Sequence, residues 1–93
     1  MFPNRISYTF DFNGPSYAID TACSSSLYAM HQAIRSIRIG ECDAAIIGGC
    51  NLLLKPQMSL QFHRLSMLSQ DGACRAFDAD GKGYVRSEAV SVI

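Results

Sequence analysis

The spacing of apolar and polar positions changes several times along this chain, and each change marks an expected element. Over residues 27–39 the apolar side chains recur every three or four positions, as on one face of a helix, and Gly40 follows as a stop signal. Residues 16–20 are expected to form a short strand, and residues 44–49, which are apolar without alternation, a buried strand. Strand, helix and buried strand within about 35 residues predict a βαβ unit with parallel strands and a right-handed crossover.

The expected helix, residues 24–39, has one apolar face. We expect this face to be buried, and Arg35 and Arg38 near the C-terminal end, where they complement the helix dipole, to be exposed. The apolar face consists of Leu27, Met30, Ile34 and Ile37.

The N-terminal segment is ambiguous by spacing alone. Apolar residues alternate with polar ones over residues 6–12, which favours a strand. Residues 13–15, Asn-Gly-Pro, form a turn on any interpretation.

The second half of the chain has weaker signals. Pro56 is placed to open a short helix with three large apolar side chains on one face. A polar loop is expected over about residues 69–83, and a last strand from about Glu88. The apolar face of the short helix consists of Met58, Phe62 and Leu65.

Cys23 is the strongest candidate for a catalytic residue, because it lies where the first expected strand meets the helix. Residues 20–26 read Asp-Thr-Ala-Cys-Ser-Ser-Ser. Unpaired amides and the positive end of the dipole at a helix N-terminus favour the thiolate, the nucleophilic form of cysteine. Small neighbours leave room for a group to approach the sulfur. The pattern indicates a nucleophile on a sharp turn, although a lone cysteine beside an apolar helix is more often a small buried hydrophobe.

Composition argues against several other classes of protein. Of the 93 residues 48% are hydrophobic, which suits one small domain, and eight basic residues balance eight acidic ones. This balance gives no indication of a nucleic-acid or anionic membrane surface. No apolar run approaches the ~20 residues of a membrane span, and the N-terminus has no secretory signal, so we expect a cytoplasmic protein.

Metal binding is not expected from the cysteines or the acidic residues. Cys42, Cys50 and Cys74 form neither a C-x-x-C pair nor a His/Cys cluster, and we interpret them as reduced packing or surface residues. Residues 78–83 begin like a calcium loop, but a lysine stands where an oxygen ligand is needed and the closing glutamate is absent. This stretch is interpreted as a tight turn.

Two further motifs receive structural interpretations. The pair Gly48-Gly49 lacks the lysine and the spaced glycines of a phosphate loop, and close packing at the end of a strand explains it. Arg86 and Glu88 are interpreted as a structural ion-pairing feature.

Residues 20–26, together with several other segments, resemble the β-ketoacyl synthases, the condensing enzymes of fatty acid and polyketide synthesis. Residues 83–90 are most similar to the synthase domain of animal-type fatty acid synthases, whereas most polyketide synthases place glycine where this chain has Ala89. The other matching segments are residues 4–8, 11–12, 14–16, 48–49, 52–56, 67–69, 71–72, 77–78 and 81–88.

The resemblance implies an α/β fold of the thiolase type, layered α/β/α/β/α, that is incomplete in this chain. Residues 1–93 are expected to be part of one β-ketoacyl synthase domain, in its N-terminal half, with the nucleophile turn. The N-terminal segment then becomes a short helix ending near Phe10 rather than a strand. We expect such a fragment to be inactive alone.

The resemblance also implies a reaction and its partners. Cys23 would be the acyl-thioester nucleophile, and its backbone amide would contribute to the oxyanion hole. Malonyl-ACP would lose carbon dioxide, and the resulting carbanion would attack the Cys23 thioester. The implied partners are an acyl carrier protein domain, whose phosphopantetheine carries the acyl and malonyl thioesters, and a second copy in a homodimer. No directly bound cofactor, metal, nucleic acid or membrane span is implied.

The two histidines of the chain are poor candidates for a catalytic base. His31 lies eight residues after Cys23, ~12 Å along the expected helix, which is outside hydrogen-bond reach. Nothing in the context of His63 supports a catalytic role, and the resemblance places the two catalytic histidines C-terminal to this region. By alignment to the family's pattern Phe62 borders the acyl-chain pocket; ordinary packing on a helix face is its alternative.

Two alternatives to a fatty acid synthase stay open. One is another condensing enzyme, such as a polyketide synthase ketosynthase or a thiolase, that shares the nucleophile turn. The other is a truncated product without function.

Overall fold

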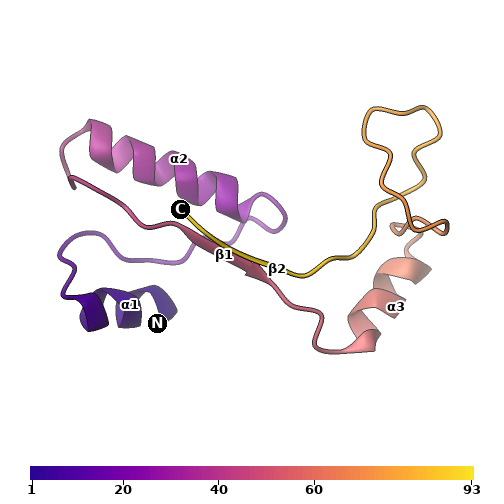
Figure 1. Ribbon diagram of the computed structural model, residues 1–93, viewed down its shortest axis with the longest axis horizontal. Coiled ribbons are helices and arrows are strands. Elements are labelled where there is room, and N and C mark those ends of the chain that lie inside the picture. The colour runs from indigo at the N-terminus through magenta and orange to yellow at the C-terminus, as the bar shows by residue number, and fades with distance from the viewer. The chain divides into compact units, whose positions relative to one another are not determined.

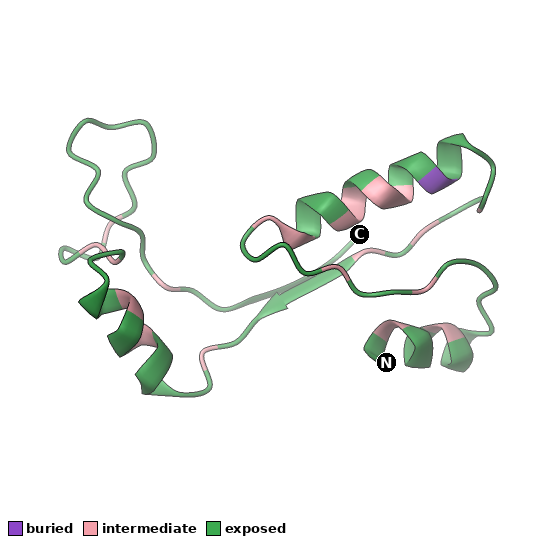
Figure 2. Cartoon of the chain, turned by 180° about the vertical axis from the view of Figure 1, so that it is seen from behind, coloured by how far each residue is buried: buried purple, intermediate pink, exposed green.

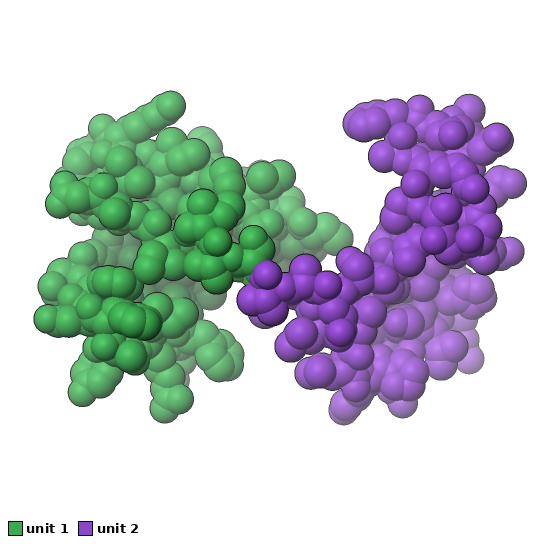
Figure 3. All heavy atoms as spheres, in the orientation of Figure 1, with its two compact units in different colours: residues 1–49, 91–93 green, residues 50–90 purple.

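The computed structural model describes all 93 residues, with three helices and two short strands (Figure 1). The chain divides into two compact units, residues 1–49 with 91–93 and residues 50–90 (Figure 3). The elements are α1 (Phe2–Phe10), α2 (Ser25–Arg38), β1 (Gly48–Asn51), α3 (Pro56–Arg64) and β2 (Ala89–Val92). No helix is both long and apolar enough to cross a membrane.

Helix α1 confirms the helix that the resemblance implied, and the strand favoured by alternation is wrong. Pro3 stands in the first turn, where its missing N–H is not needed. The helix ends at Asp11, which adopts a left-handed φ of 54° and donates its N–H to Tyr8 O. The Ser16 hydroxyl then bonds back to Asn4 Oδ1 at 3.4 Å, which ties the following segment to the helix.

Helix α2 lies within one residue of its expected bounds. Gly40 follows it with φ +73°, the left-handed conformation that the stop signal predicted. Next to this end the Ser36 hydroxyl donates to Glu41 Oε2 at 2.7 Å. Ser36 is the one residue of the chain that is buried.

The expected burial of the apolar face of α2 is wrong for this chain (Figure 2). Leu27 is 68% exposed, Ile34 and Ile37 are also exposed, and only Met30 is half-buried, while Arg35 and Arg38 are exposed as expected. No hydrophobic side chain of the chain is buried at all. The total accessible surface is 8115 Å², where a compact protein of 10.2 kDa exposes about 5,300 Å². These 93 residues therefore contain no element that covers the face.

The expected βαβ unit is also absent. Residues 16–20 form no strand, and β1 begins at Gly48 rather than at residue 44 and is exposed rather than buried. Its partner is β2, and the pairing is antiparallel, because Ile47 and Ile93 exchange two N–H···O bonds of 2.9 Å. The apolar run before β1 has no parallel neighbour among these residues. The absence of polar positions in that run therefore did not determine which segment pairs with it.

The second half of the chain confirms the short helix at Pro56, the loop that follows it and a last strand near Glu88. The loop returns to its own start, where Tyr84 exchanges hydrogen bonds with Met67 and Ser69 at 3.1 and 2.9 Å. Gly83 makes this approach possible, since a Cβ at that position would lie 2.6 Å from Met67 O.

The expected ion pair between Arg86 and Glu88 is wrong. Glu88 Oε1 accepts the N–H of Leu53 at 2.6 Å, and the guanidinium of Arg86 lies over the ring of Phe62. The neighbouring Ser87 O accepts a bond from Asn51 Nδ2 at 2.6 Å. Each charged group thus satisfies a distant partner instead of its sequence neighbour.

Candidate functional site: a nucleophile elbow

Cys23 occupies a sharp turn between the extended residues 16–20 and the start of α2. Its thiol is free and the residue is exposed. The residue before it, Ala22, has φ +56°, a left-handed conformation that costs a non-glycine residue about 1–2 kcal/mol. The chain therefore keeps a strained residue next to an exposed thiol.

Local hydrogen bonds hold this turn from both sides. The Ala22 N–H donates to Asp20 Oδ1 at 3.0 Å. The Ser25 hydroxyl accepts the Thr21 N–H at 2.9 Å and donates to Ala22 O at 2.6 Å. Every partner lies within four residues, so the turn is built by its own sequence.

The amides at the start of α2 are left open. Ser24 occupies the N-cap position but makes no side-chain capping bond, because its hydroxyl turns back to Thr21 O at 2.8 Å. The N–H groups of Ser26 and Leu27 have no acceptor in the chain, and the Cys23 N–H takes part in none of the bonds of the turn. Unpaired amides beside an exposed thiol form a local environment that stabilises negative charge.

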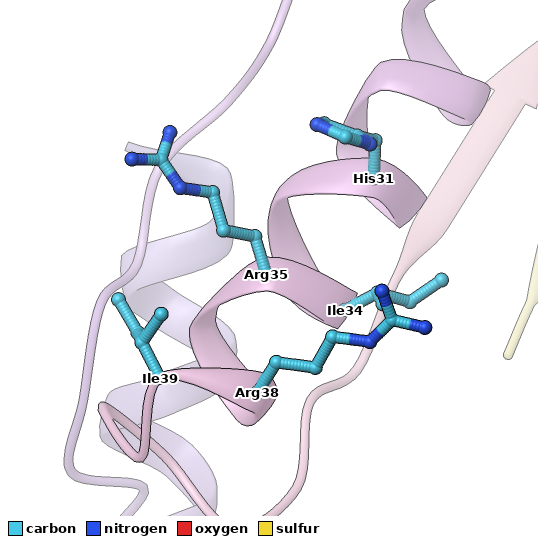
Figure 4. A pocket seen from close by; sticks show the side chains of 5 residues that line it. All are labelled: His31, Ile34, Arg35, Arg38 and Ile39. Carbon is cyan, nitrogen blue, oxygen red and sulfur yellow. The ribbon is translucent and has the colours of Figure 1, made fainter.

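The two histidines of the chain lie on different helices. His31 lies on α2 and lines a shallow surface depression of about 260 Å³ (Figure 4). The depression lies on α2 and the residue that follows it, and contains no nucleophile; its other lining residues are Ile34, Arg35, Arg38 and Ile39. His63 lies near the end of α3, in the second unit.

The other free cysteines have no comparable surroundings. Cys50 is exposed on β1, and Cys42 is half-buried. Cys74 is exposed and its sulfur accepts the N–H of Val85 at 3.1 Å. No group of three or more His, Cys, Asp or Glu side chains is arranged to hold a metal ion.

Phe62 lies in a small aromatic cluster of the second unit, defined here as Phe62, Tyr84 and Arg86. The guanidinium carbon of Arg86 is 4.7 Å from the Phe62 ring centroid, and Tyr84 meets the same ring edge-on at 6.4 Å. Arg86 also donates to the Tyr84 hydroxyl at 3.4 Å. The ring of a half-buried Phe62 is therefore held from two sides.

The glycine pair fits its expected role only in part. A Cβ on Gly49 would meet Ser26 Cβ at 3.5 Å, an ordinary contact, and Gly48 has open space around it. Close packing thus applies to Gly49, where α2 lies alongside the segment that enters β1 (Figure 1).

Cys23 thus combines an exposed free thiol with a strained, hydrogen-bonded turn that opens a helix. The family described as "Beta-ketoacyl synthase, N-terminal domain" matches residues 1–93, and the chain belongs to this family. The family expected from the sequence motifs is thereby confirmed.

Relatives of known function include two kinds of synthase. The chain is 64% identical over its whole length to a fatty acid synthase of Anser anser anser, of which it covers 26%. It is 50% identical over 97% of its length to a highly reducing polyketide synthase of Gibberella moniliformis, of which it covers 4%. The chain thus spans about a quarter of the goose protein and a much smaller part of the fungal one.

Solved structures give the same fold. The oxazolomycin ketosynthase domain of Streptomyces albus superposes with a TM-score of 0.88 at 50% identity, and a ketosynthase of the bacillaene synthase from Bacillus subtilis with 0.90 at 40% identity. Each match covers 97% of this chain and 16% of the solved chain. The chain therefore has the fold of one part of a ketosynthase domain, and the expected incomplete α/β fold holds at this level.

Sequence reasoning placed Cys23 correctly on the turn but missed the residues that hold it. Asp20 and Ser25 stand in the same seven-residue motif, where the serines were interpreted only as small side chains. Asp and Ser just before a helix are frequent backbone acceptors, and this preference was the available signal. Nothing in the local pattern indicated that Arg86 packs on Phe62.

Proposed function

We propose that these residues are the nucleophile-bearing part of a β-ketoacyl-ACP synthase that serves fatty acid biosynthesis. The observation that carries this proposal is the geometry of Cys23: an exposed thiol on a hydrogen-bonded elbow, beside amides that have no acceptor. Membership of the β-ketoacyl synthase family supports the reaction type. In this proposal residues 1–93 belong to the N-terminal half of one domain layered α/β/α/β/α.

The chemistry begins with acyl transfer. The Cys23 thiolate attacks the carbonyl carbon of an acyl thioester on the phosphopantetheine arm of an acyl carrier protein. The C–S bond to pantetheine breaks, its thiolate leaves and takes up a proton, and a Cys23 thioester forms. The unbonded Cys23 N–H is available to the oxyanion of the tetrahedral intermediate.

The second step is decarboxylative condensation. Malonyl carrier protein loses carbon dioxide, and its carbanion attacks the Cys23 thioester to give a 3-oxoacyl product and the free thiol. We assign the decarboxylation to histidines outside these residues, as the resemblance to the β-ketoacyl synthases implies.

Fatty acid synthesis is preferred over polyketide synthesis for two reasons. Identity to the goose fatty acid synthase is 64%, against 50% for the fungal polyketide synthase. Residues 87–89 also read Ser-Glu-Ala, without the glycine typical of polyketide synthases. The parent enzyme would act as a cytoplasmic homodimer that receives substrates from its carrier protein domain and binds no cofactor directly.

Phe62 is proposed to border the acyl-chain pocket. Its half-buried ring, fixed by Tyr84 and Arg86, provides an apolar wall of defined orientation. A wall of this kind recognises hydrocarbon by contact area rather than by hydrogen bonds.

The test uses a synthase that contains these residues and a radiolabelled acyl carrier protein. Cys23→Ala is expected to abolish labelling of the synthase domain, because no other thiol lies at a helix N-terminus. Cys50→Ser, which alters an equally exposed thiol on β1, is the matched control and should keep the wild-type level. Retention of label on the Cys23→Ala domain would refute the assignment.

A further inference from the structure

The hydroxyl of Ser25 bonds to the backbone on both sides of the strained residue that precedes Cys23. It accepts the N–H of Thr21 at 2.9 Å and donates to the carbonyl of Ala22 at 2.6 Å. The backbone N–H of Ser25 bonds to the same Ala22 carbonyl at 3.1 Å. One residue therefore makes three hydrogen bonds to the two residues of the turn.

These bonds depend on the left-handed conformation of Ala22. A φ of +56° is unfavourable for alanine, so the turn needs compensation from its surroundings. The two hydrogen bonds of the Ser25 hydroxyl supply compensation of comparable size. The Asp20 carboxylate accepts a bond from the Ala22 N–H but, having no hydrogen to donate, cannot bond to the Ala22 carbonyl.

The other two serines of the motif do not share this arrangement. The Ser24 hydroxyl bonds only to Thr21, through its carbonyl and its hydroxyl. The Ser26 hydroxyl makes no hydrogen bond, and its Cβ instead faces Gly49. Three adjacent serines thus have three different environments, and only that of Ser25 encloses Ala22.

We propose that Ser25 is a positioning residue for Cys23. Its hydroxyl holds Thr21 and Ala22 in the turn that presents Cys23 at the start of α2 with its thiol exposed and its N–H unbonded. The inference rests on the proposed acylation of Cys23. Ser25 itself does not touch the acyl group; it acts by fixing the backbone from which both the nucleophile and its oxyanion donor project.

The experiment compares four variants in a synthase that contains these residues, with acetyl-pantetheine as the acyl donor. Ser25→Ala removes the hydroxyl, and Ser26→Ala removes one that has no partner. Ser25→Thr and Ser25→Val form a second pair, since both are branched at Cβ and only threonine keeps the hydroxyl. The rate constant for acylation of Cys23 at saturating donor, the KM for the donor and the thermal midpoint are measured for each.

We expect Ser25→Ala to lower the saturating rate about 10-fold or more while KM changes less than about 2-fold, because the misplaced groups act in the transition state. Ser26→Ala should match the wild type. Ser25→Thr should exceed Ser25→Val by about 5-fold or more, and this comparison stands even if the alanine variant fails to fold.

Three outcomes would overturn the role of Ser25. These are a wild-type rate in Ser25→Ala, equal losses in Ser25→Ala and Ser26→Ala, and equal rates in the threonine and valine variants. A change in thermal midpoint without a change in rate likewise makes Ser25 structural only. The proposed function fails separately, through acylation of the Cys23→Ala domain, whatever the Ser25 variants do.

Discussion

The turn that carries Cys23 and the region around Phe62 are each held by a few contacts, but these contacts span very different lengths of chain. In the turn the bonds from Ala22 to Asp20 and from Thr21 to Ser25 join residues two and four positions apart. Around Phe62 the ring meets Tyr84 and Arg86 from the far side of the loop, and the nearby bonds from Leu53 and Asn51 span 35 and 36 positions.

The difference predicts how each region responds to substitution. A network that closes over a few residues pays little loop-closure entropy and retains its geometry largely through its own sequence. A region built from distant segments must close a long loop before any contact forms, so its contacts are needed for folding. Substitutions in the second unit should therefore reduce stability, and those in the turn should reduce acyl transfer.

The largest effect is expected from Gly83→Ala. Its Cβ would lie 2.6 Å from Met67 O and 2.7 Å from Leu68 C and Ser69 N, and its φ is +121°. The pairing of Tyr84 with the start of the loop must open to admit it, at a cost of about 2–4 kcal/mol. Chemical denaturation of a synthase domain that contains the chain measures this.

Gly72→Ala is the matched control for Gly83→Ala. Gly72 has a similarly positive φ of +71° but no atom within 4 Å of the added Cβ, so only backbone strain of about 1–2 kcal/mol is expected. Equal losses in the two variants would show that close approach of the loop segments does not hold the second unit together.

A smaller loss is expected from Arg86→Met. The variant keeps the length of the side chain and removes the cation over the Phe62 ring, an interaction worth about 0.5–2 kcal/mol. It also removes a buried Nε–H that has no hydrogen-bond partner, which offsets part of the loss. We expect about 1 kcal/mol by denaturation, and less than about 0.5 kcal/mol for Arg64→Met on the exposed side of α3. Equal stabilities of the two variants would show that the cation–π contact does not stabilise the fold measurably.

Asp20→Ala tests the turn that carries Cys23. The variant frees the Ala22 N–H by removing an exposed acceptor, so stability should fall by no more than about 1 kcal/mol. Acylation of Cys23 should nevertheless slow, because the turn loses one of its constraints. Asp20→Asn keeps an oxygen at the same position and should recover most of the rate. If Asp20→Ala lost stability and acylation rate in proportion, the turn would resemble the second unit, where substitutions are expected to act through stability.

How much the sequence predicts follows from the same distinction. The position of Cys23 on a turn, the bounds of α2 and the left-handed Gly40 depend on neighbours in the chain, and all three were predicted correctly. The buried apolar face of α2 and the parallel partner of β1 were not, because both depend on which distant segment lies alongside. A pattern of apolar residues indicates that a surface can be buried, but it does not identify the segment that packs against it.

The ion pair expected between Arg86 and Glu88 failed for a related reason. Residues two apart in an extended segment lie on the same face, so their spacing allows such pairing, but the side chains contact distant segments instead. Each found a partner elsewhere, Phe62 and the Leu53 N–H. The holding bonds of Ser25 and Asp20 were within reach of sequence reasoning, since Ser and Asp before a helix are known to bond to nearby backbone.

The smallest effect concerns Asp71, which forms a local network inside the second unit. The hydroxyl of Ser69 and then the guanidinium of Arg75 donate to its carboxylate and hold the pKa of Asp71 below its usual 3.8. Because the pKa is lower in the folded chain, the contribution to stability is present above pH 3.8 and is lost as the pH falls through the folded value. The group is fully exposed, so this contribution is small.

The Asp71 network provides the sharpest test of the comparison, because it lies in the second unit but closes over only a few residues. Ser69→Ala should raise the pKa of Asp71 toward its usual value, as followed by carboxyl chemical shift in an NMR titration, whereas Ser59→Ala on α3 should not. If hydrogen bonds between residues close in the chain keep their geometry without long-range contacts, the pKa of Asp71 should stay lowered in Gly83→Ala even as that variant loses stability. A pKa that returns to its usual value in Gly83→Ala would mean that the local bonds depend on the long-range pairing after all.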